Sequence, residues 1–241
     1  MMDNFEQQFS TLLGQHQLTI TTEQLAQFDI YYRLLVEWNE KMNLTGITER
    51  EQVYVKHFYD SISLSFYVPI PAVSSMIDIG SGAGFPSIPL KIMFPHLRLT
   101  IIDSLNKRIQ FLRHLSIELG LAEAEFIHSR AEDAARLPAY RDQFDLVTAR
   151  AVARLNVLNE LCLPFVRNGG QFAAMKGADI TDELNEAKTS LKQLNAKLVE
   201  KHHFKLPLED AMRHLVIIEK IGATPKKFPR KAGLPLKQPL I

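Results

Sequence analysis

The residues best suited to bind a small molecule lie close together near position 80. The segment IDIGSGAGFP, residues 77–86, places Asp78 before three alternating glycines, Gly80, Gly82 and Gly84. Glycines remove the side chains that would keep a ligand away from the backbone. The segment follows a strand-like run and precedes a helix-like run, and open α/β sheets bind ligands at such strand ends. We therefore expect a ligand site here, with a plain glycine-rich turn as the alternative.

The spacing of the glycines separates the candidate cofactors. A dinucleotide fingerprint requires G-x-G-x-x-G, and Phe85 stands where its third glycine would be. No Gly-Lys-Ser/Thr follows, so a phosphate-binding P-loop is excluded. The D-x-G-x-G-x-G pattern instead resembles the first motif of S-adenosylmethionine-dependent methyltransferases. That resemblance implies that Asp78, Gly80, Gly82 and Gly84 receive the methionine end of the cofactor, whose ammonium group suits a carboxylate.

Two later strand ends offer further cofactor contacts. Asp103 ends a strand-like run, and a carboxylate at that position is able to accept hydrogen bonds from both ribose hydroxyls. Alternatively Asp103 caps the next helix, and the neighbouring Ser104 is a candidate for either role. Ala131 and Glu132 follow the next strand-like run and border the expected adenine position. Their backbone groups or the Glu132 carboxylate are predicted to contact adenine, with capping of the next turn as the alternative.

The fourth strand-like run, residues 144–149, narrows the choice of methyl acceptor. Enzymes that methylate exocyclic amines of bases carry an Asn/Asp-Pro-Pro-aromatic motif here, and this chain does not. Methylation of pyrimidine carbon needs a cysteine nucleophile, but Cys162 lies in an apolar run typical of a buried side chain. An acceptor with a free lone pair, such as guanine N7, needs no general base. Positioning of two bound reactants then supplies most of the catalysis.

Cationic side chains follow the fourth and fifth strand-like runs. We predict Arg150 as the catalytic contact to the target base, because a guanidinium matches guanine edges and phosphates. Arg154, four residues later, would share a helix face with Arg150. Lys176 is a candidate phosphate contact on the same rim. Surface salt bridges are the alternative for both arginines.

Strand-like and helix-like runs alternate after residue 72, and they must position these side chains. Predicted strands cover residues 76–80, 98–103, 124–129, 144–149 and 170–175, and predicted helices cover 86–94, 105–119, 151–165 and 179–195. This order predicts an α/β fold, a mostly parallel sheet with helices on both faces. Two further runs, 197–206 and 213–221, have no helix-length insert between them. They should form an antiparallel hairpin at one end of a seven-stranded sheet.

Residues 1–70 are predicted to form an N-terminal helical extension, and residues 71–241 the methyltransferase domain. The extension has one helix after a cap at Thr21–Thr22 and a second over residues 51–66. The polar loop between them carries three uncharged hydrogen-bonding residues suited to RNA base edges or to closing over the cofactor: Asn39, Asn43 and Thr45. The second helix carries His57, Asp60 and Ser61 within about one turn. An internal hydrogen-bond network and a functional role are equally good readings of that group, and we expect no metal site.

The chain has 241 residues, of which 46% are apolar and 23% are charged. This composition is typical of globular proteins. A single cysteine excludes an intramolecular disulfide. Residues 222–241 hold five basic residues and no acid, which is typical of a polyanion contact or of a solvated terminus. Residues 1–70 hold nine acids and four bases. The chain has neither a bilayer-spanning run nor a signal-peptide pattern, so we expect the cytoplasm.

Over nearly its whole length the chain resembles the bacterial small-subunit rRNA guanine-N7 methyltransferase family, once called glucose-inhibited division protein B. The resemblance is carried by Trp38-Asn39, Asn43-Leu44-Thr45, His57, Asp60-Ser61, residues 78–90, Arg130-Ala131-Glu132, Thr148-Ala149-Arg150-Ala151, Lys176-Gly177 and residues 228–235. It implies a Rossmann-like class I methyltransferase fold, S-adenosylmethionine as donor, and a guanine in the 530 loop of 16S rRNA as acceptor. It also implies cofactor contacts from Gly80, Phe85, Ala131, Glu132 and Arg150, so Arg150 is assigned to both sites. Ser87 departs from the family motif, where glycine is expected.

The expected partner is 16S rRNA or the small ribosomal subunit. Phosphate contacts are predicted from the sheet rim and from the basic tail, including Arg230 and Lys231. We expect a monomer that binds neither a membrane nor a metal. The alternatives are a methyltransferase for a small molecule or protein, a nicotinamide-dependent oxidoreductase, and an RNA-binding protein that kept the fold without catalysis.

Overall fold

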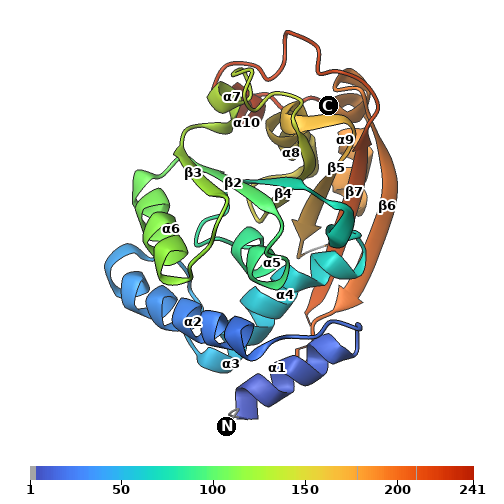
Figure 1. Ribbon diagram of the computed structural model, residues 1–241. Helices are drawn as coiled ribbons and strands as arrows, with labels where there is room; N and C mark the ends of the chain where they lie inside the picture. The colour runs from blue at the N-terminus through green and yellow to red at the C-terminus, as the bar shows by residue number, and fades with distance from the viewer. Residues whose placement is uncertain (1–3, 178, 210) are drawn as a thin grey trace.

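A seven-stranded mixed sheet lies at the centre of the computed structural model, which describes residues 4–177, 179–209 and 211–241 (Figure 1). The strand order is β3-β2-β1-β4-β5-β7-β6. The strands are β1 (Ser75–Ile79), β2 (Arg98–Asp103), β3 (Ala124–His128), β4 (Phe144–Arg150), β5 (Val166–Lys176), β6 (Ala196–Lys205) and β7 (Met212–Lys220). Neighbours from β3 to β5 pair in parallel, whereas β7 pairs antiparallel with β5 and β6. The predicted α/β fold and its antiparallel C-terminal hairpin are confirmed.

Ten α-helices are described around the sheet. They are α1 (Asn4–Gly14), α2 (Thr22–Met42), α3 (Arg50–Val53), α4 (Asp60–Ile62), α5 (Ser87–Met93), α6 (Asn106–Glu118), α7 (Ala131–Ala134), α8 (Leu155–Cys162), α9 (Thr181–Gln193) and α10 (Leu234–Lys237). Within the described ranges, no helix has the length and apolar character needed to cross a membrane.

Helix α2 begins where the sequence predicts. The Thr21 hydroxyl accepts a hydrogen bond from the Gln24 backbone N–H, and the Gln24 side chain accepts one from the Thr21 N–H. This reciprocal capping satisfies two N–H groups that a helix start leaves unpaired. One face of the helix is buried, as its apolar spacing requires. The helix ends at Asn43, whose φ of 51° leaves the right-handed region.

Two predicted helices are less regular than their spacing suggests. Residues 51–66 are divided into α3, a π-helical turn (Tyr54–Tyr59), α4 and a 3₁₀ turn (Ser63–Phe66). A π turn is wider than an α-helical turn, and both Phe58 within it and Asp60 directly after it are buried. The helix predicted over 151–165 begins only at Leu155, because Ala151 has a φ of 57°. Arg150 therefore ends β4 and Arg154 precedes α8, so the predicted shared helix face is wrong.

The sheet separates two apolar cores. Met76 on β1 belongs to the core that contains the aromatic residues of the N-terminal helices together with α5 and α6. Ile77 and Ile79 belong to the core formed with α8, α9 and the C-terminal segment. Successive side chains of a strand point to opposite faces, which explains this division. The N-terminal helices thus cover one face of the sheet and share its core.

Phe58→Ala tests that shared core. The Phe58 ring lies 4.9 Å from Phe28 and 5.1 Å from Tyr31, centroid to centroid, and is fully buried. We expect its truncation to lower the free energy of unfolding by about 3–5 kcal/mol. Ile117→Ala, at a side chain that is 75% exposed on α6, is the control and should change it by less than about 0.5 kcal/mol. Equal midpoints for both variants in urea would contradict the shared core.

Candidate active site

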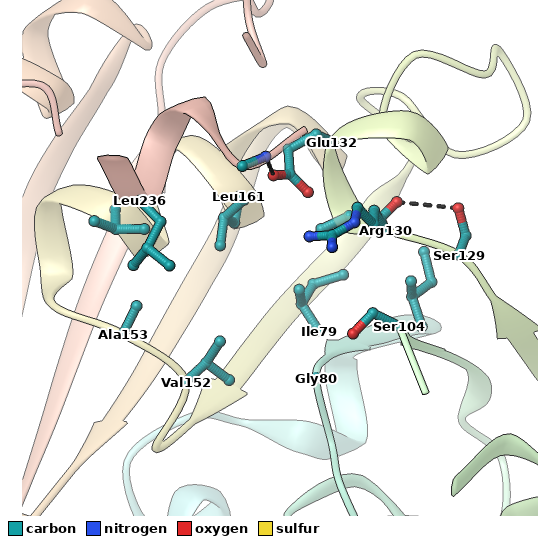
Figure 2. A pocket seen from close by; sticks show the side chains of 14 residues that line it. Ile79, Gly80, Ser104, Ser129, Arg130, Glu132, Val152, Ala153, Leu161 and Leu236 are labelled. Atoms are coloured by element: carbon teal, nitrogen blue, oxygen red, sulfur yellow. Dashed lines mark hydrogen bonds between the residues drawn. The ribbon is translucent and has the colours of Figure 1, made fainter. Parts of the chain in front are cut away.

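A cavity of about 280 Å³ opens at the carboxyl ends of β1 to β4 (Figure 2). Four of the predicted cofactor residues line it, namely Gly80, Ser104, Ala131 and Glu132. Aliphatic side chains form much of the remaining wall, including Leu161 on α8. An apolar cleft with a few polar groups is typical of a small-molecule site. The structure therefore brings together the residues that follow three different strands.

The three glycines of the loop have different structural surroundings. Gly80 has a φ of 74°, and a Cβ there would lie 3.0 Å from the Val152 side chain across the cavity. Gly82 donates its backbone N–H to Asp103 Oδ2 over 3.2 Å. At Gly84 a Cβ would lie 2.8 Å from the Tyr31 hydroxyl. Of the three, only Gly80 lines the cavity, and ligand contact by the three glycines stays a prediction.

The Asp103 carboxylate accepts hydrogen bonds from the turn before α6 and from the glycine loop. Its Oδ1 accepts a hydrogen bond from the Leu105 N–H over 2.8 Å, at the start of α6, and its Oδ2 accepts from Gly82. Arg108 lies 3.4 Å from the same Oδ2. Ser104 makes no side-chain cap and faces the cavity instead (Figure 2). Asp103 thus stabilises the turn before α6 without capping the helix, whose N-cap residue Leu105 has no side-chain cap, and a ribose contact from Asp103 stays a prediction.

The Glu132 carboxylate has a partner from the C-terminal segment. Its Oε1 accepts a hydrogen bond from the Gly233 backbone N–H over 2.7 Å. Glu132 is 6% exposed and lines the cavity beside Ala131. One oxygen of this carboxylate therefore binds the C-terminal segment at Gly233, and the residue also borders the predicted adenine position.

Asp78 is buried beneath the glycine loop and does not line the cavity. Neither of its carboxylate oxygens has a hydrogen-bond partner among the described residues. Burial raises the pKa of the carboxyl from 3.8 to about 7, while weak contacts with the hydroxyl and backbone N–H of Ser87, and the Arg150 charge, act in the opposite direction. A buried carboxylate without partners is costly, and protonation or a bound ammonium group relieves that cost.

These features fit S-adenosylmethionine. The cavity combines the open backbone at Gly80, an apolar wall for a purine face, and polar groups after β2 and β3. The unpartnered Asp78 carboxyl below the loop suits a cationic amino acid group. In the part of the chain that the structure describes, no cluster of three or more His, Cys, Asp or Glu side chains is arranged to hold a metal ion.

A second cavity, of about 490 Å³, lies beside the first and is lined by cationic groups. Arg150 lines this second cavity and does not line the first. Its Nη1 donates to Asp60 Oδ2 over 2.9 Å, and Arg213 Nε donates to the other oxygen of Asp60 over 3.1 Å. Asp60 is 3% exposed, so two guanidinium groups neutralise a buried carboxylate. Helix α4 is thereby joined to β4 and β7 at this site.

Aromatic rings support the second cavity. The Arg150 guanidinium lies 5.0 Å from the centre of the Phe85 ring, and His57 stacks on the same ring at 4.5 Å. The Phe85 side chain is buried there and does not line the first cavity, so the implied cofactor contact by that side chain is not seen. Burial lowers the pKa of His57 to about 3, and the Arg150 charge lowers it further. His57 is therefore neutral near pH 7.

Asn39 and Thr45 form a network beside His57, although the prediction that Asn39 lies in a loop is wrong because α2 continues to Met42. Asn39 Oδ1 accepts a hydrogen bond from the Thr45 backbone N–H over 2.8 Å. The Thr45 hydroxyl lies 2.8 Å from His57 Nε2. The Ser61 hydroxyl donates to the His57 carbonyl over 2.5 Å. The internal-network reading thus describes these residues, while contact of Asn39, Asn43 or Thr45 with RNA stays a prediction.

Three predicted substrate contacts already have partners within the chain. Arg154 forms a two-pronged ion pair with Glu186 on the surface. Lys176 pairs with Glu183 at 2.7 Å and donates to the Ala153 carbonyl. Arg230 is bound to a buried glutamate, as described below, whereas Lys231 is exposed. For Arg154 the salt-bridge alternative describes the structure.

Sequence reasoning missed several residues that line the two cavities. Val152 and Leu236 border the first cavity, and Arg213 and Lys56 border the second. The "TARA" run adjoins Val152 and hinted at that position. Arg213 lies on the second strand of the hairpin, 63 positions from Arg150, and only the sheet order brings them together. Cys162, in contrast, is fully buried as expected, and burial raises the pKa of its thiol well above its ordinary value.

Comparison with known proteins assigns the chain to a family. The family model described as "rRNA small subunit methyltransferase G" matches residues 24–216. The chain is 58% identical over 236 residues to the ribosomal RNA small subunit methyltransferase G of Brevibacillus brevis, covering 98% of this chain and 99% of that protein. The chain belongs to the rRNA small subunit methyltransferase G family. The protein of the same name from Staphylococcus aureus is 56% identical over 229 residues, 95% of each chain.

Solved structures confirm the fold at much lower identity. A chain from the complex between the Haloferax volcanii Trm112 methyltransferase activator and a putative methyltransferase aligns with a TM-score of 0.57 and 13% identity, over 78% of this chain and 98% of that one. The mitomycin 7-O-methyltransferase MmcR aligns with a TM-score of 0.55 and 14% identity, over 78% and 60%. The predicted family, class I methyltransferase fold and S-adenosylmethionine cofactor are thus confirmed, and the oxidoreductase alternative is wrong.

Asp78→Asn tests the buried carboxyl. Burial raises the pKa of the native carboxyl from 3.8 to about 7, so the native protein binds this proton more tightly than the unfolded chain does. Relative to a variant that does not titrate, its free energy of unfolding is therefore highest below pH 4. It falls by up to about 4 kcal/mol as the pH rises from 4 through 7. We therefore expect the unfolding free energy of the variant, minus that of the native protein, to increase from pH 5 to pH 8 in urea titrations. A difference that does not change with pH would show that the native carboxyl is solvated.

Proposed function

We propose that this protein transfers a methyl group from S-adenosylmethionine to N7 of a guanine in the 530 loop of 16S rRNA. Membership of the rRNA small subunit methyltransferase G family supports a ribosomal RNA substrate. The observation that carries the proposal is the wall shared by the two cavities. Ala151 lines the second cavity, and the next two residues, Val152 and Ala153, line the first. Donor and acceptor sites thus meet at the segment that follows β4.

The donor site is the cavity at Gly80. We assign the adenine end to Ala131 and Glu132, the ribose to Ser104 and Asp103, and the amino acid end to the glycine loop above Asp78. When bound, S-adenosylmethionine supplies an electrophilic methyl group on a sulfonium centre. The chain contributes an apolar wall that excludes water, and it holds the loop backbone open at Gly80.

The acceptor site is the cavity that Arg150 and Arg213 line. Guanidinium groups donate to guanine O6 and to phosphate oxygens, so this pair selects for a guanine nucleotide. The neutral His57 and the Phe85 ring below Arg150 form an aromatic support for that contact. The target base must leave its stack to enter such a cavity.

The groups in the acceptor site match a reaction without proton removal. Both carboxylates that line it are ion-paired, Asp60 with the two arginines and Glu183 with Lys176. His57 is a weak base because its pKa is about 3. Guanine N7 has a free lone pair, which forms the new C–N bond while the C–S bond breaks and its electron pair passes to sulfur. Catalysis then rests on holding the two reactants in line, which contributes roughly 7–11 kcal/mol in favourable cases.

Exposed lysines of the C-terminal segment provide the electrostatic contact to RNA. Lys226, Lys227, Lys231 and Lys237 are all exposed. Phosphate contacts of this kind release counterions, so binding should weaken steeply with salt. Arg230 is better placed to anchor the segment than to contact RNA, because it is held by a buried glutamate.

The substrate assignment is tested by methyl transfer from labelled S-adenosylmethionine. We expect label on naked 16S rRNA or on 30S subunits, recovered as 7-methylguanosine at one position in the 530 loop. tRNA of equal mass is the control and should stay unlabelled. Label on tRNA alone, or on an exocyclic amine of any RNA, would contradict the proposal.

Arg150→Ala separates the acceptor site from the donor site. Asp60 keeps its Arg213 partner in this variant, so the fold should be retained. We expect kcat/KM for rRNA methylation to fall about 100-fold or more, with the affinity for S-adenosylhomocysteine changed less than about threefold. Arg154→Ala, which removes a surface ion pair, is the matched control and should change neither by more than about threefold. A large loss of S-adenosylhomocysteine affinity in Arg150→Ala would place this residue in the donor site.

A further inference from the structure

The C-terminal segment crosses the top of the molecule beside α7 and α8, coloured red in Figure 1. We call residues 224–238 the strap. Arg141 donates to the Thr224 and Phe228 carbonyls, each over 2.9 Å. The Phe228 side chain is 2% exposed and belongs to the core shared with α8 and α9. The start of the strap therefore has a defined position.

A buried charge holds the middle of the strap. Glu160 on α8 is 1% exposed, and its two oxygens accept from Arg230 Nε over 2.9 Å and Nη2 over 2.6 Å. The Arg230 backbone N–H also donates to Glu160, over 2.7 Å. A two-pronged contact of this kind sets direction as well as position. A buried carboxylate without its partner would be strongly destabilising, so the strap is docked in the ground state.

The end of the strap forms part of the cofactor cavity. Gly233 and Leu236 line the cavity, and the Gly233 N–H donates to Glu132. Leu236 lies beside Leu161 and across the cavity from Ser104 (Figure 2). The Leu236 side chain is 68% exposed, which leaves an apolar surface open at the mouth of the cavity.

We propose that the strap is a cofactor-binding element, in which Leu236 packs against the adenosyl group of S-adenosylmethionine and closes that end of the cavity. Glu132 follows β3, the end of the site assigned to adenine, and its carboxylate accepts the Gly233 N–H near the end of the strap. A purine face gains from an apolar contact at this position. The strap lies outside the residues matched by the family model, 24–216, yet the Brevibacillus brevis relative aligns over 98% of the chain.

This inference depends on S-adenosylmethionine as donor and is independent of which nucleotide is methylated. Its test therefore uses S-adenosylhomocysteine and 5′-methylthioadenosine without RNA, in isothermal titration calorimetry on full-length protein. We expect Leu236→Ala to weaken both ligands by about tenfold, because each carries the adenosyl group that loses an apolar contact. Lys237→Ala, the next residue of α10 and exposed, is the matched control and should bind both ligands like the native protein.

Hydrogen exchange supplies a second readout on the native protein. We expect S-adenosylhomocysteine to slow exchange of the amides of Gly233, Leu234, Leu236 and Lys237 at least fivefold, because a covered strap opens less often. Unchanged affinities in Leu236→Ala together with unchanged exchange in the strap would overturn the proposal. If the ligand-binding and exchange results are as expected but the native protein does not methylate 16S rRNA, the assigned substrate is wrong and the role of the strap stands.

Discussion

The contact between Tyr31 and the glycine loop connects the N-terminal helices to both cavities. The Tyr31 hydroxyl donates to the Ala83 carbonyl over 2.6 Å, in space that exists because Gly84 carries no side chain. The Tyr31 ring also stacks on Phe85 at 5.4 Å. A mostly parallel sheet must be covered on both faces. The helix α2, which covers one face, therefore also positions the loop that borders the first cavity and the Phe85 ring that packs under Arg150 at the second.

Buried charges join parts of the chain that are far apart in sequence. Asp60 connects α4 to the end of β4 and the start of β7, and Glu160 connects α8 to the strap. Lys220, which is fully buried, donates to Asp142 and to Thr224 at the start of the strap. Each such group is costly to bury and strongly destabilising to leave unpaired. These ion pairs consequently fix the positions of the elements that form the walls of the two cavities.

Local patterns predicted much of the fold. The strand β2 and the helix α6 follow directly from apolar spacing, and the Thr21 cap follows from a side chain within one turn of its partner. The π turn at Tyr54–Tyr59 did not follow, because the core it packs against comes from α2 and the sheet. The break at Ala151 was missed for a similar reason. Lys176 holds the Ala153 carbonyl from a neighbouring strand, which no local pattern records.

For the site, residue types and spacing determined which ligand could bind and roughly where. Gly80, Ser104, Ala131 and Glu132 follow successive strands, and parallel strands bring their carboxyl ends to one edge of the sheet. Tertiary structure alone decided which cations face a ligand. Arg150 pairs with Asp60 and still lines the second cavity, whereas Arg154 and Arg230 pair with glutamates 32 and 70 positions away and line neither cavity. Charge partners are set by distance in space, and a sequence records only distance along the chain.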